Sequence, residues 1–463
     1  MTRPYSVGLL AALTTFACAT PERVPLDAEA ARHALMERAT QEVSLEQSLA
    51  ADLPGSLLVT PTPAACATPD QHGYWYLRAA AWSPEVRAQR RALGAAQMAS
   101  KSAGAPGAIA VQVIDPDLQG DEGVLNALAA FDLVGLLGLG PSAAEQGLAQ
   151  AQVEAARAGL EDAAWRAWLE SERALVVWRA AARRRERLTQ FSEQAGTDMR
   201  RALLLDEAGR VGASTLDSAT GATGELERRA SLATDGVTRA RARLAAVVGV
   251  DPEAALPQGA PQTTPPVFLG GDEPELWFMS HEHLEAHPRL RMARRAFEVR
   301  EQEVRQAAAR AWPGVSLGPR LGFVDPTELG GVLRITVPFP SSWRGLLAAA
   351  TERRDGAIEA YEDELHLLQT SERDALSRVT EATARARGAS QEVVRSLVEE
   401  WEAARAGFQV QRTPLKEWTG SLRRLSMRAT WDIDDDERRD LAALDLVASR
   451  GPMASPLFMG ASQ

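Results

Sequence analysis

The chain is built as two copies of one large unit, and this duplication limits its possible folds more than any other feature of its 463 residues. Short motifs recur in the same order in both halves: SPEVR at 83–87 and HPRLR at 287–291, GPS at 140–142 and FPS at 339–341, LAAVVG at 244–249 and LVASRG at 446–451. Their spacing of about 200 residues is far longer than the roughly 20–50-residue periods of solenoid repeats. A whole domain-sized unit is therefore duplicated.

The repeat divides the chain into successive parts. A proline-rich stretch separates the two copies, and such a composition favours extended chain over helix. We expect a signal peptide at 1–17, an N-terminal segment with a short helix and an insertion at 18–79, a first repeat at 80–250, a connector at 251–280, a second repeat at 281–451 and a tail at 452–463.

Each copy predicts one very long helix beside two shorter ones. Proline-free stretches cover 142–207 and 341–406, and each would be about 100 Å long as a helix. After breaks at 209–212 and 407–414, return helices end near Val248 and Ala448. Further helices are expected at 84–102 and 288–312. Stacked end to end, the two shorter helices nearly equal the long one, which predicts a long tube wall rather than a compact globule.

The first long helix carries two local signals. Ser142 and Glu145 have the capping-box spacing, so we expect Ser142 to be the N-cap. A coiled-coil seam of mostly small residues follows at 4-3-4-3 spacing and stops at Asp162; it comprises Ala144, Leu148, Ala151, Ala155 and Ala158.

Four short segments predict strands, at 108–115, 131–139, 315–324 and 332–339. In the last two, apolar and polar residues alternate strictly, which gives each strand one apolar face. Their length of about 8–10 residues is close to what a tilted strand needs to cross a bilayer. The residues that would then face lipid are Leu317, Leu321, Phe323, Leu333, Ile335 and Val337.

Two tryptophans flank these strands, and both would lie at one membrane edge. Trp312 precedes the third strand and Trp343 follows the fourth, and aromatic residues are enriched at membrane interfaces. The alternative is an ordinary half-buried antiparallel sheet. Four strands cannot close a barrel, so a barrel in lipid would require several chains.

The composition and the N-terminus narrow the class of protein. A formal net charge of −11 argues against nucleic acid as the main partner, since a duplex binder needs a basic surface. Only two cysteines occur, Cys18 and Cys66, so no disulfide framework organises the fold. Arg3, an apolar run at 7–17 and Cys18 directly after Ala17 are typical of a secretory signal with a lipidation site at Cys18. The alternative is an ordinary signal peptide in which Cys18 is incidental.

Two further clusters each allow two interpretations. His281, His283 and His287, with Glu282 and Glu285, have spacings that zinc sites use, but they also lie where a helix begins, and we predict no metal. The acidic residues Asp432, Asp434, Asp435, Asp436 and Glu437 either line a cation path or form a solvated helix face. The chain has no phosphate loop, nucleophile elbow or acid–base pair, so we expect neither an enzyme nor a cofactor.

Taken in order, these motifs resemble the TolC family of outer-membrane efflux and export proteins. The resemblance covers about 41–451 apart from an insertion at 54–79. VSLEQSL at 43–49 resembles the family's opening helix. AHPRL at 286–290 resembles the Asn-Pro-x-Leu motif at which the family's helices recurrently begin, with His in place of Asn. AWPGVSL at 311–317 resembles the family's transition from helix to strand.

The resemblance implies a mainly α fold with a small β part, in which two tandem repeats form long helical hairpins. Three chains would together form a periplasmic α-helical barrel and a twelve-stranded transmembrane β-barrel in the outer membrane. Such a homotrimer would passively conduct substrate received from a periplasmic adaptor and an inner-membrane pump. The alternative is a lipid-anchored periplasmic coiled-coil structural or adaptor protein without a conducting pore.

The family's adaptor-facing hairpin tips would correspond to the two breaks between long helices. The first comprises Gly209, Arg210, Val211, Gly212, Leu216 and Asp217, and the second Gly407, Thr413, Pro414 and Leu415.

Overall fold

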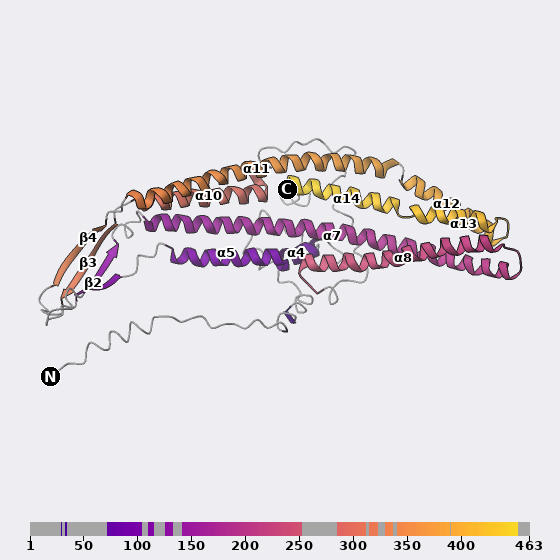
Figure 1. Cartoon of the computed structure of the whole chain (residues 1–463), viewed down its shortest axis with the longest axis horizontal. Coiled ribbons are helices and arrows are strands. Elements are labelled where there is room, and N and C mark those ends of the chain that lie inside the picture. The colour runs from indigo at the N-terminus through magenta and orange to yellow at the C-terminus, as the bar shows by residue number, and fades with distance from the viewer. Residues whose placement is uncertain are drawn as a thin grey trace, which may run out of the picture.

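The computed structural model describes residues 72–103, 110–114, 126–132, 141–251, 285–311, 314–322, 329–336, 340–388 and 390–451, together with positions 29, 33 and 34. The helix expected at 43–49, most of the connector, Cys18, Trp312, Phe323 and Val337 lie outside these residues. The described chain is elongated, with the strands at one end and the turns of two helical hairpins at the other (Figure 1).

The elements fall into two successive units with a similar order of helices and strands. The first unit contains α4 (His72–Trp82), α5 (Pro84–Ser102), β1 (Ala110–Ile114), β2 (Asn126–Asp132), α7 (Pro141–Glu207) and α8 (Ala213–Val248). The second contains α10 (Pro288–Ala309), β3 (Gly314–Gly322), β4 (Leu329–Thr336), α11 (Pro340–Gly388), α12 (Ser390–Gln409), α13 (Leu415–Arg428) and α14 (Trp431–Arg450). The predicted mainly helical architecture is therefore confirmed.

In the first unit, α7 runs unbroken beside α5 and α8, as predicted (Figure 1). Its 67 residues correspond to about 100 Å. The expected N-cap is wrong, because the helix already begins at Pro141 and the Ser142 hydroxyl has no hydrogen-bond partner in the structure. Proline suits the first helical position, since the N–H it lacks would have no partner there.

The second unit is predicted to contain one continuous helix over 341–406. α11 ends at Gly388 and α12 begins at Ser390, and because residue 389 lies outside the described residues, helix continuity at that point stays a prediction. The return helix is interrupted at Ala429–Thr430. The Ser390 hydroxyl donates to the Asp435 carboxylate of α14, which ties the start of α12 to α14 across the hairpin.

A glycine joint connects the stacked helices in both units. Gly249 ends α8 with φ +74°, and a Cβ there would lie 2.3 Å from the Trp82 carbonyl oxygen, just before α5 begins. Gly451 ends α14 with φ +81°, and a Cβ there would lie 2.9 Å from Cδ2 of His287, just before α10 begins. Only glycine fits both the backbone conformation and the space.

The strands form one antiparallel sheet in the order β1-β2-β3-β4. The predicted second strand at 131–139 begins too late, since β2 already begins at Asn126; residues 133–139 lie outside the described residues. Pairing fixes this position, because Ala127 lies opposite both Val113 of β1 and Leu321 of β3. Such non-local pairing leaves no signature in the strand itself.

Two apolar cores lie along the helices. The core near mid-length gathers tryptophans, with the Trp75 ring edge-on to Trp178 at 6.5 Å and Trp165 stacked on Trp168 at 4.7 Å. Trp75 belongs to α4, a helix that we did not predict from the sequence. The core nearer the hairpin turns contains Phe191, Trp401, Phe408 and Trp418. None of the described helices is both long and apolar enough to span a lipid bilayer.

We predict that Gly249→Ala destabilises the chain by at least about 2 kcal/mol, because the methyl group would collide with a backbone carbonyl at a positive φ. The measurement is urea or thermal unfolding followed by circular dichroism. Gly94→Ala is the matched control, since a Cβ at Gly94 meets nothing within 4 Å and alanine favours the helix. Equal losses of stability from the two substitutions would contradict the claim that the joint requires glycine at position 249.

Candidate functional site

The two hairpin turns lie together at the end of the molecule opposite the strands (Figure 1). In the first turn, Gly209 has φ +69°, its N–H donates to the Asp206 carbonyl at 2.7 Å, and the Arg210 N–H donates to the Leu205 carbonyl at 2.9 Å. This is a Schellman motif, in which a left-handed residue closes the end of α7.

The second turn repeats the same motif with glutamine in the left-handed position. The Gln411 N–H donates to the Phe408 carbonyl at 3.0 Å and the Arg412 N–H to the Gly407 carbonyl at 2.8 Å, while Gln411 has φ +60°. A non-glycine residue there is strained. The Gln411 side chain accepts a hydrogen bond from Arg210 Nη1 at 3.3 Å, which links the second turn to the first. Sequence reasoning missed Gln411, because glycine is the usual signal for this backbone conformation.

The tip residues expected from the sequence fall at or near these turns. Gly209, Arg210, Val211 and Gly212 connect α7 to α8, and Thr413 and Pro414 connect α12 to α13. Leu216 and Asp217 lie in the first turns of α8, Leu415 is the buried first residue of α13, and Gly407 lies in α12. A Cβ on Gly407 would collide with Oγ1 of Thr413, so a larger residue there would force the Thr413 side chain to move.

Exposed apolar side chains surround the turns. Leu204, near the end of α7, is 64 % exposed, and Val410, at the end of α12, is 63 % exposed. Leu203 is also exposed. No local sequence pattern distinguishes them from the core leucines and valines of the same helices.

A buried carboxylate fixes the two hairpins just behind the turns. Asp198 of α7 is 2 % exposed and accepts hydrogen bonds from Arg405 Nε at 2.8 Å and Gln409 Nε2 at 3.0 Å, both from α12. A buried charge is tolerated when it is paired and hydrogen-bonded in this way. Asp198 therefore sets the position of one hairpin tip against the other.

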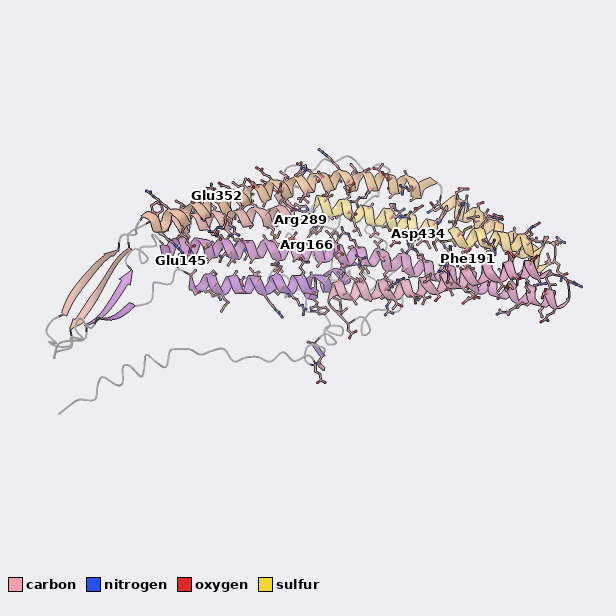
Figure 2. All side chains as sticks on the ribbon, in the orientation of Figure 1. Glu145, Arg166, Phe191, Arg289, Glu352 and Asp434 are labelled. Carbon is pink, nitrogen blue, oxygen red and sulfur yellow. The ribbon has the colours of Figure 1, made fainter. Side chains whose placement is uncertain are left out.

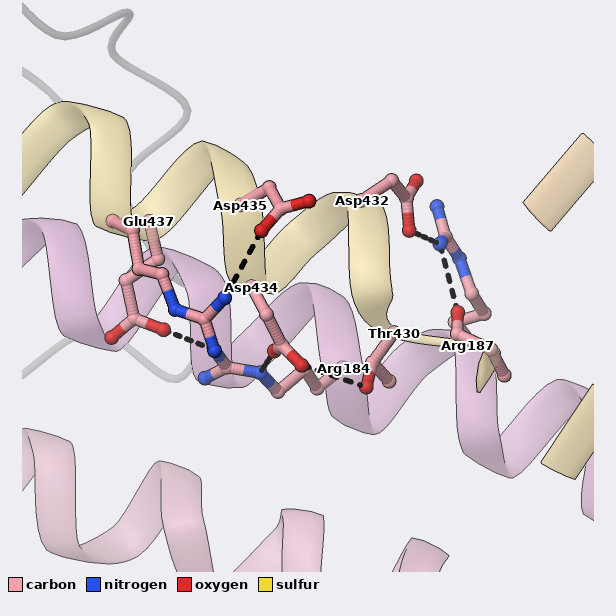
Figure 3. Close-up of polar contacts among 9 residues, drawn as sticks. Arg184, Arg187, Thr430, Asp432, Asp434, Asp435 and Glu437 are labelled. Atoms are coloured by element: carbon pink, nitrogen blue, oxygen red, sulfur yellow. Dashed lines mark hydrogen bonds and ion pairs between the residues drawn. The ribbon is translucent and has the colours of Figure 1, made fainter. Parts of the chain in front are cut away.

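The acidic residues at the start of α14 bind arginines of α7 (Figure 3). This contact differs from both interpretations offered by the sequence, a cation path and a solvated helix face. Arg184 Nε donates to Asp434 at 2.6 Å and its Nη2 to Glu437. Arg187 donates to Asp432 and, at 3.0 Å, to the Ala429 carbonyl at the break before α14. Burial lowers the pKa of Arg184, but its hydrogen bonds to Glu437 and Asp434 outweigh burial and raise it.

The remaining acidic residues are also engaged. Asp435 is buried and binds Ser390 and Arg438, and Arg183 binds Asp436 at 3.3 Å. The run is therefore a contact between the two units and not a free solvated face. Charges paired in this way are also not available to line a cation path.

Nearer the middle of the molecule the charges are reversed, and α7 supplies the carboxylates of the ion pairs. Glu161, which is 1 % exposed, binds Arg291 of α10 at 2.8 Å. Asp162, also 1 % exposed, binds Arg166, which in turn binds Glu85 of α5. Burial raises the pKa of Glu161 and of Asp162 despite the neighbouring arginines. Figure 2 shows Arg166 and Arg289 in this middle region, with Asp434 and Phe191 nearer the turns.

Metal binding finds no support at His287. Its ring is fully buried, with Nδ1 accepting from the Arg289 N–H and Nε2 bonded to the Ala448 carbonyl. His281 and His283 lie outside the described residues. In the part of the chain that the structure describes, no three His, Cys, Asp or Glu side chains form a metal-binding group.

The fold is similar to that of solved outer-membrane channels. The open state of the Neisseria gonorrhoeae MtrE outer membrane channel matches with a TM-score of 0.67 and 15 % identity, over 82 % of this chain and 88 % of that chain. The outer membrane protein VceC from Vibrio cholerae matches with a TM-score of 0.64 and 17 % identity, over 82 % and 96 %. The Campylobacter jejuni CmeC outer membrane channel matches with a TM-score of 0.66 and 12 % identity, over 82 % and 85 %.

No protein-family model matches the sequence, and no curated protein matches it significantly. The chain therefore shares the fold of TolC-like outer-membrane channels at low sequence identity, as the sequence motifs predicted.

We predict that Gln411→Gly stabilises the chain by about 1 kcal/mol, because glycine adopts a positive φ without steric cost. Thermal unfolding is the measurement. The converse change, Gly209→Gln, places a side chain at φ +69° and should destabilise by a similar amount. A destabilising Gln411→Gly would mean that the bond to Arg210 outweighs the backbone strain.

Proposed function

We propose that this chain is the outer-membrane channel of a tripartite efflux or type I export system. The observation that carries the proposal is the arrangement of two long helical hairpins that end together at one end of the molecule, with one antiparallel sheet at the other. The solved channels with this fold support it. Substrate would pass through the pore passively, with energy supplied by an inner-membrane pump.

The open edges of the sheet support assembly of several chains, and the resemblance to the TolC family implies that their number is three. The order β1-β2-β3-β4 leaves β1 and β4 with one open edge each among the described strands. Inside lipid an open edge leaves backbone groups without partners, so β1 of one chain would pair with β4 of the next. Three chains would close a twelve-stranded barrel. Its lipid-facing positions would be the alternating apolar residues of β3 and β4, with Trp343 at the membrane edge and acylated Cys18 as an anchor.

The hairpin tips would contact a periplasmic adaptor. Leu204 and Val410 expose apolar surface there, beside the charged side chains of Arg210 and Asp217. An exposed apolar patch with a polar rim is typical of a protein-binding surface.

Opening of the pore would use the break at Ala429–Thr430 in the second hairpin, which separates α13 from α14. α7 and α8 of the first hairpin have no such break. Arg187 holds this break through Ala429 and Asp432. A hinge at helix ends is a common way to move one packed element against another.

We expect the purified full-length chain to be a trimer by light scattering and to form discrete channels in planar lipid bilayers. Neither measurement requires the exported substrate to be known. A correctly trimeric protein with no conductance, even at high voltage, would instead indicate a lipid-anchored, non-conducting coiled-coil protein.

Arg187→Ala should raise the open probability of these channels, because it frees Ala429 and Asp432 at the break before α14. It should also reduce stability by roughly 1–3 kcal/mol, the usual range for a lost charge-assisted hydrogen bond. Arg200→Ala is the control, since exposed Arg200 donates to Thr197 of its own helix and lies away from the break. Unchanged gating in Arg187→Ala would exclude this contact as a restraint on the pore.

A further inference from the structure

The joint between α14 and α10 depends on a single buried imidazole. His287 precedes α10, and its Nδ1 accepts a hydrogen bond from the Arg289 N–H at 3.2 Å. Its Nε2 lies 3.1 Å from the carbonyl oxygen of Ala448 in the last turn of α14. Because Nδ1 accepts, the ring must be neutral with its proton on Nε2, which donates to Ala448. The same ring thus caps the start of one helix and the end of another.

The imidazole has no room to turn away from these partners. The exposed fraction of His287 is 0 %. Gly451 packs directly against the ring: a Cβ added to Gly451 would lie 2.9 Å from Cδ2 and 3.5 Å from Cα of His287. A second proton on the ring would sit on Nδ1 and point at the Arg289 N–H. Two donors would then face each other in a site closed to water.

The charged groups around the ring do not favour its protonation. On its own helix they are Arg289 and Arg291, and on α14 Arg450. Each of these arginines is already paired: Arg289 with Glu364 of α11, Arg291 with Glu161 of α7, and Arg450 with Glu372 of α11. Asp162 of α7 interacts with Arg289 and binds Arg166.

No carboxylate among the described residues hydrogen-bonds to the imidazole, and Arg289 repels a positive ring. Burial lowers the pKa of His287 to about 4, and the positive charge of Arg289 acts in the same direction. The hydrogen bond to the Ala448 carbonyl opposes this shift.

The joint of the first unit lacks such a group. Ser83 occupies the position equivalent to His287, and its side chain makes no cap hydrogen bond. The C-terminal glycine there, Gly249, packs against the backbone carbonyl of Trp82. The two joints have the same geometry, but only the second contains a side chain that titrates between neutral and mildly acidic pH.

We propose that His287 makes the α10–α14 joint an acid-sensitive device, which opens on acidification while the equivalent joint of the first unit stays closed. This proposal does not depend on the proposed function, since it concerns the folded chain alone. In an assembled channel it would loosen one line of helices in each chain near mid-length and leave α5, α7 and α8 in place.

The direction follows from linkage. When the joint opens, His287 regains its ordinary pKa of 6.5, so the open state takes up a proton more readily than the closed state. The joint is fully stable above about pH 6.5 and loses stability as the pH falls from 6.5 towards 4. If opening exposes the ring completely, these two values increase the opening equilibrium constant about 20-fold between pH 7 and pH 5.

The test is hydrogen exchange of the intact chain at pH 7 and pH 5, corrected for intrinsic exchange rates. The amides of interest are those at the ends of the joint, from Arg289 to Arg291 and from Val447 to Gly451. In the unmodified chain we expect their opening equilibrium to rise about 20-fold, whereas the amides around Gly249 change little.

His287→Asn is the matched control variant, because asparagine retains an N-cap oxygen but does not titrate. It should remove most of the pH dependence while the protein remains folded at pH 7. His287→Ala should open the joint at both pH values to the same extent. An equal pH response in the unmodified chain and in His287→Asn would overturn the proposal and assign the effect to carboxylates. A joint that does not respond to pH in the unmodified chain would overturn it directly.

Discussion

The middle of α7 is enclosed on nearly all sides, and the rest of the structure depends on this burial. Nineteen of the 24 residues from 158 to 181 are buried, because α4, α5 and α8 pack against one side of the helix and α10 and α14 against the other. Only a narrow stripe of this segment, which includes Arg166, Glu170 and Arg173, reaches solvent, so contacts with neighbouring helices orient most of its surface. Tryptophan packing holds it to its own unit, and ionic contacts hold it to the second unit.

Charge alternates along α7 and sets how the two units are aligned. Near mid-length α7 offers the acids Glu161 and Asp162, then the bases Arg173, Arg184 and Arg187, and near the turns the acid Asp198 again. The facing helices carry the opposite sign at each level. A shift along the helix axis would separate these pairs and leave buried charges such as Glu161 and Asp198 without their partners, at a cost that apolar contacts alone would not impose. The ionic contacts thus specify register more than they add stability.

Much of the helical fold could be predicted from local signals. Proline at the start and glycine at the end located α5, α7 and α8 to within about one residue, because both act through their own backbone. The elements that were missed depend on distant partners. Trp75 holds α4 against Trp178, and β2 takes its register from β3. The return helix breaks at Ala429, whose carbonyl accepts from Arg187 of the first unit.

In the candidate site, too, features set by local sequence could be predicted and features set by distant partners could not. Turn residues revealed the positions of both tips, but the arginine partners of the acidic run lie about 245–253 residues away in sequence and could not be matched without the fold.

The glycine joints restrict how such a chain can change in length during evolution. Each residue added to a helix rotates everything beyond it by about 100°, so a single insertion in α8 would turn the Gly249 joint away from Trp82. An insertion between the joint and the turn must therefore be matched in α7 and complete whole turns, as about seven or eleven residues do. Changes of one or two residues are expected only in the turns themselves or between the strands.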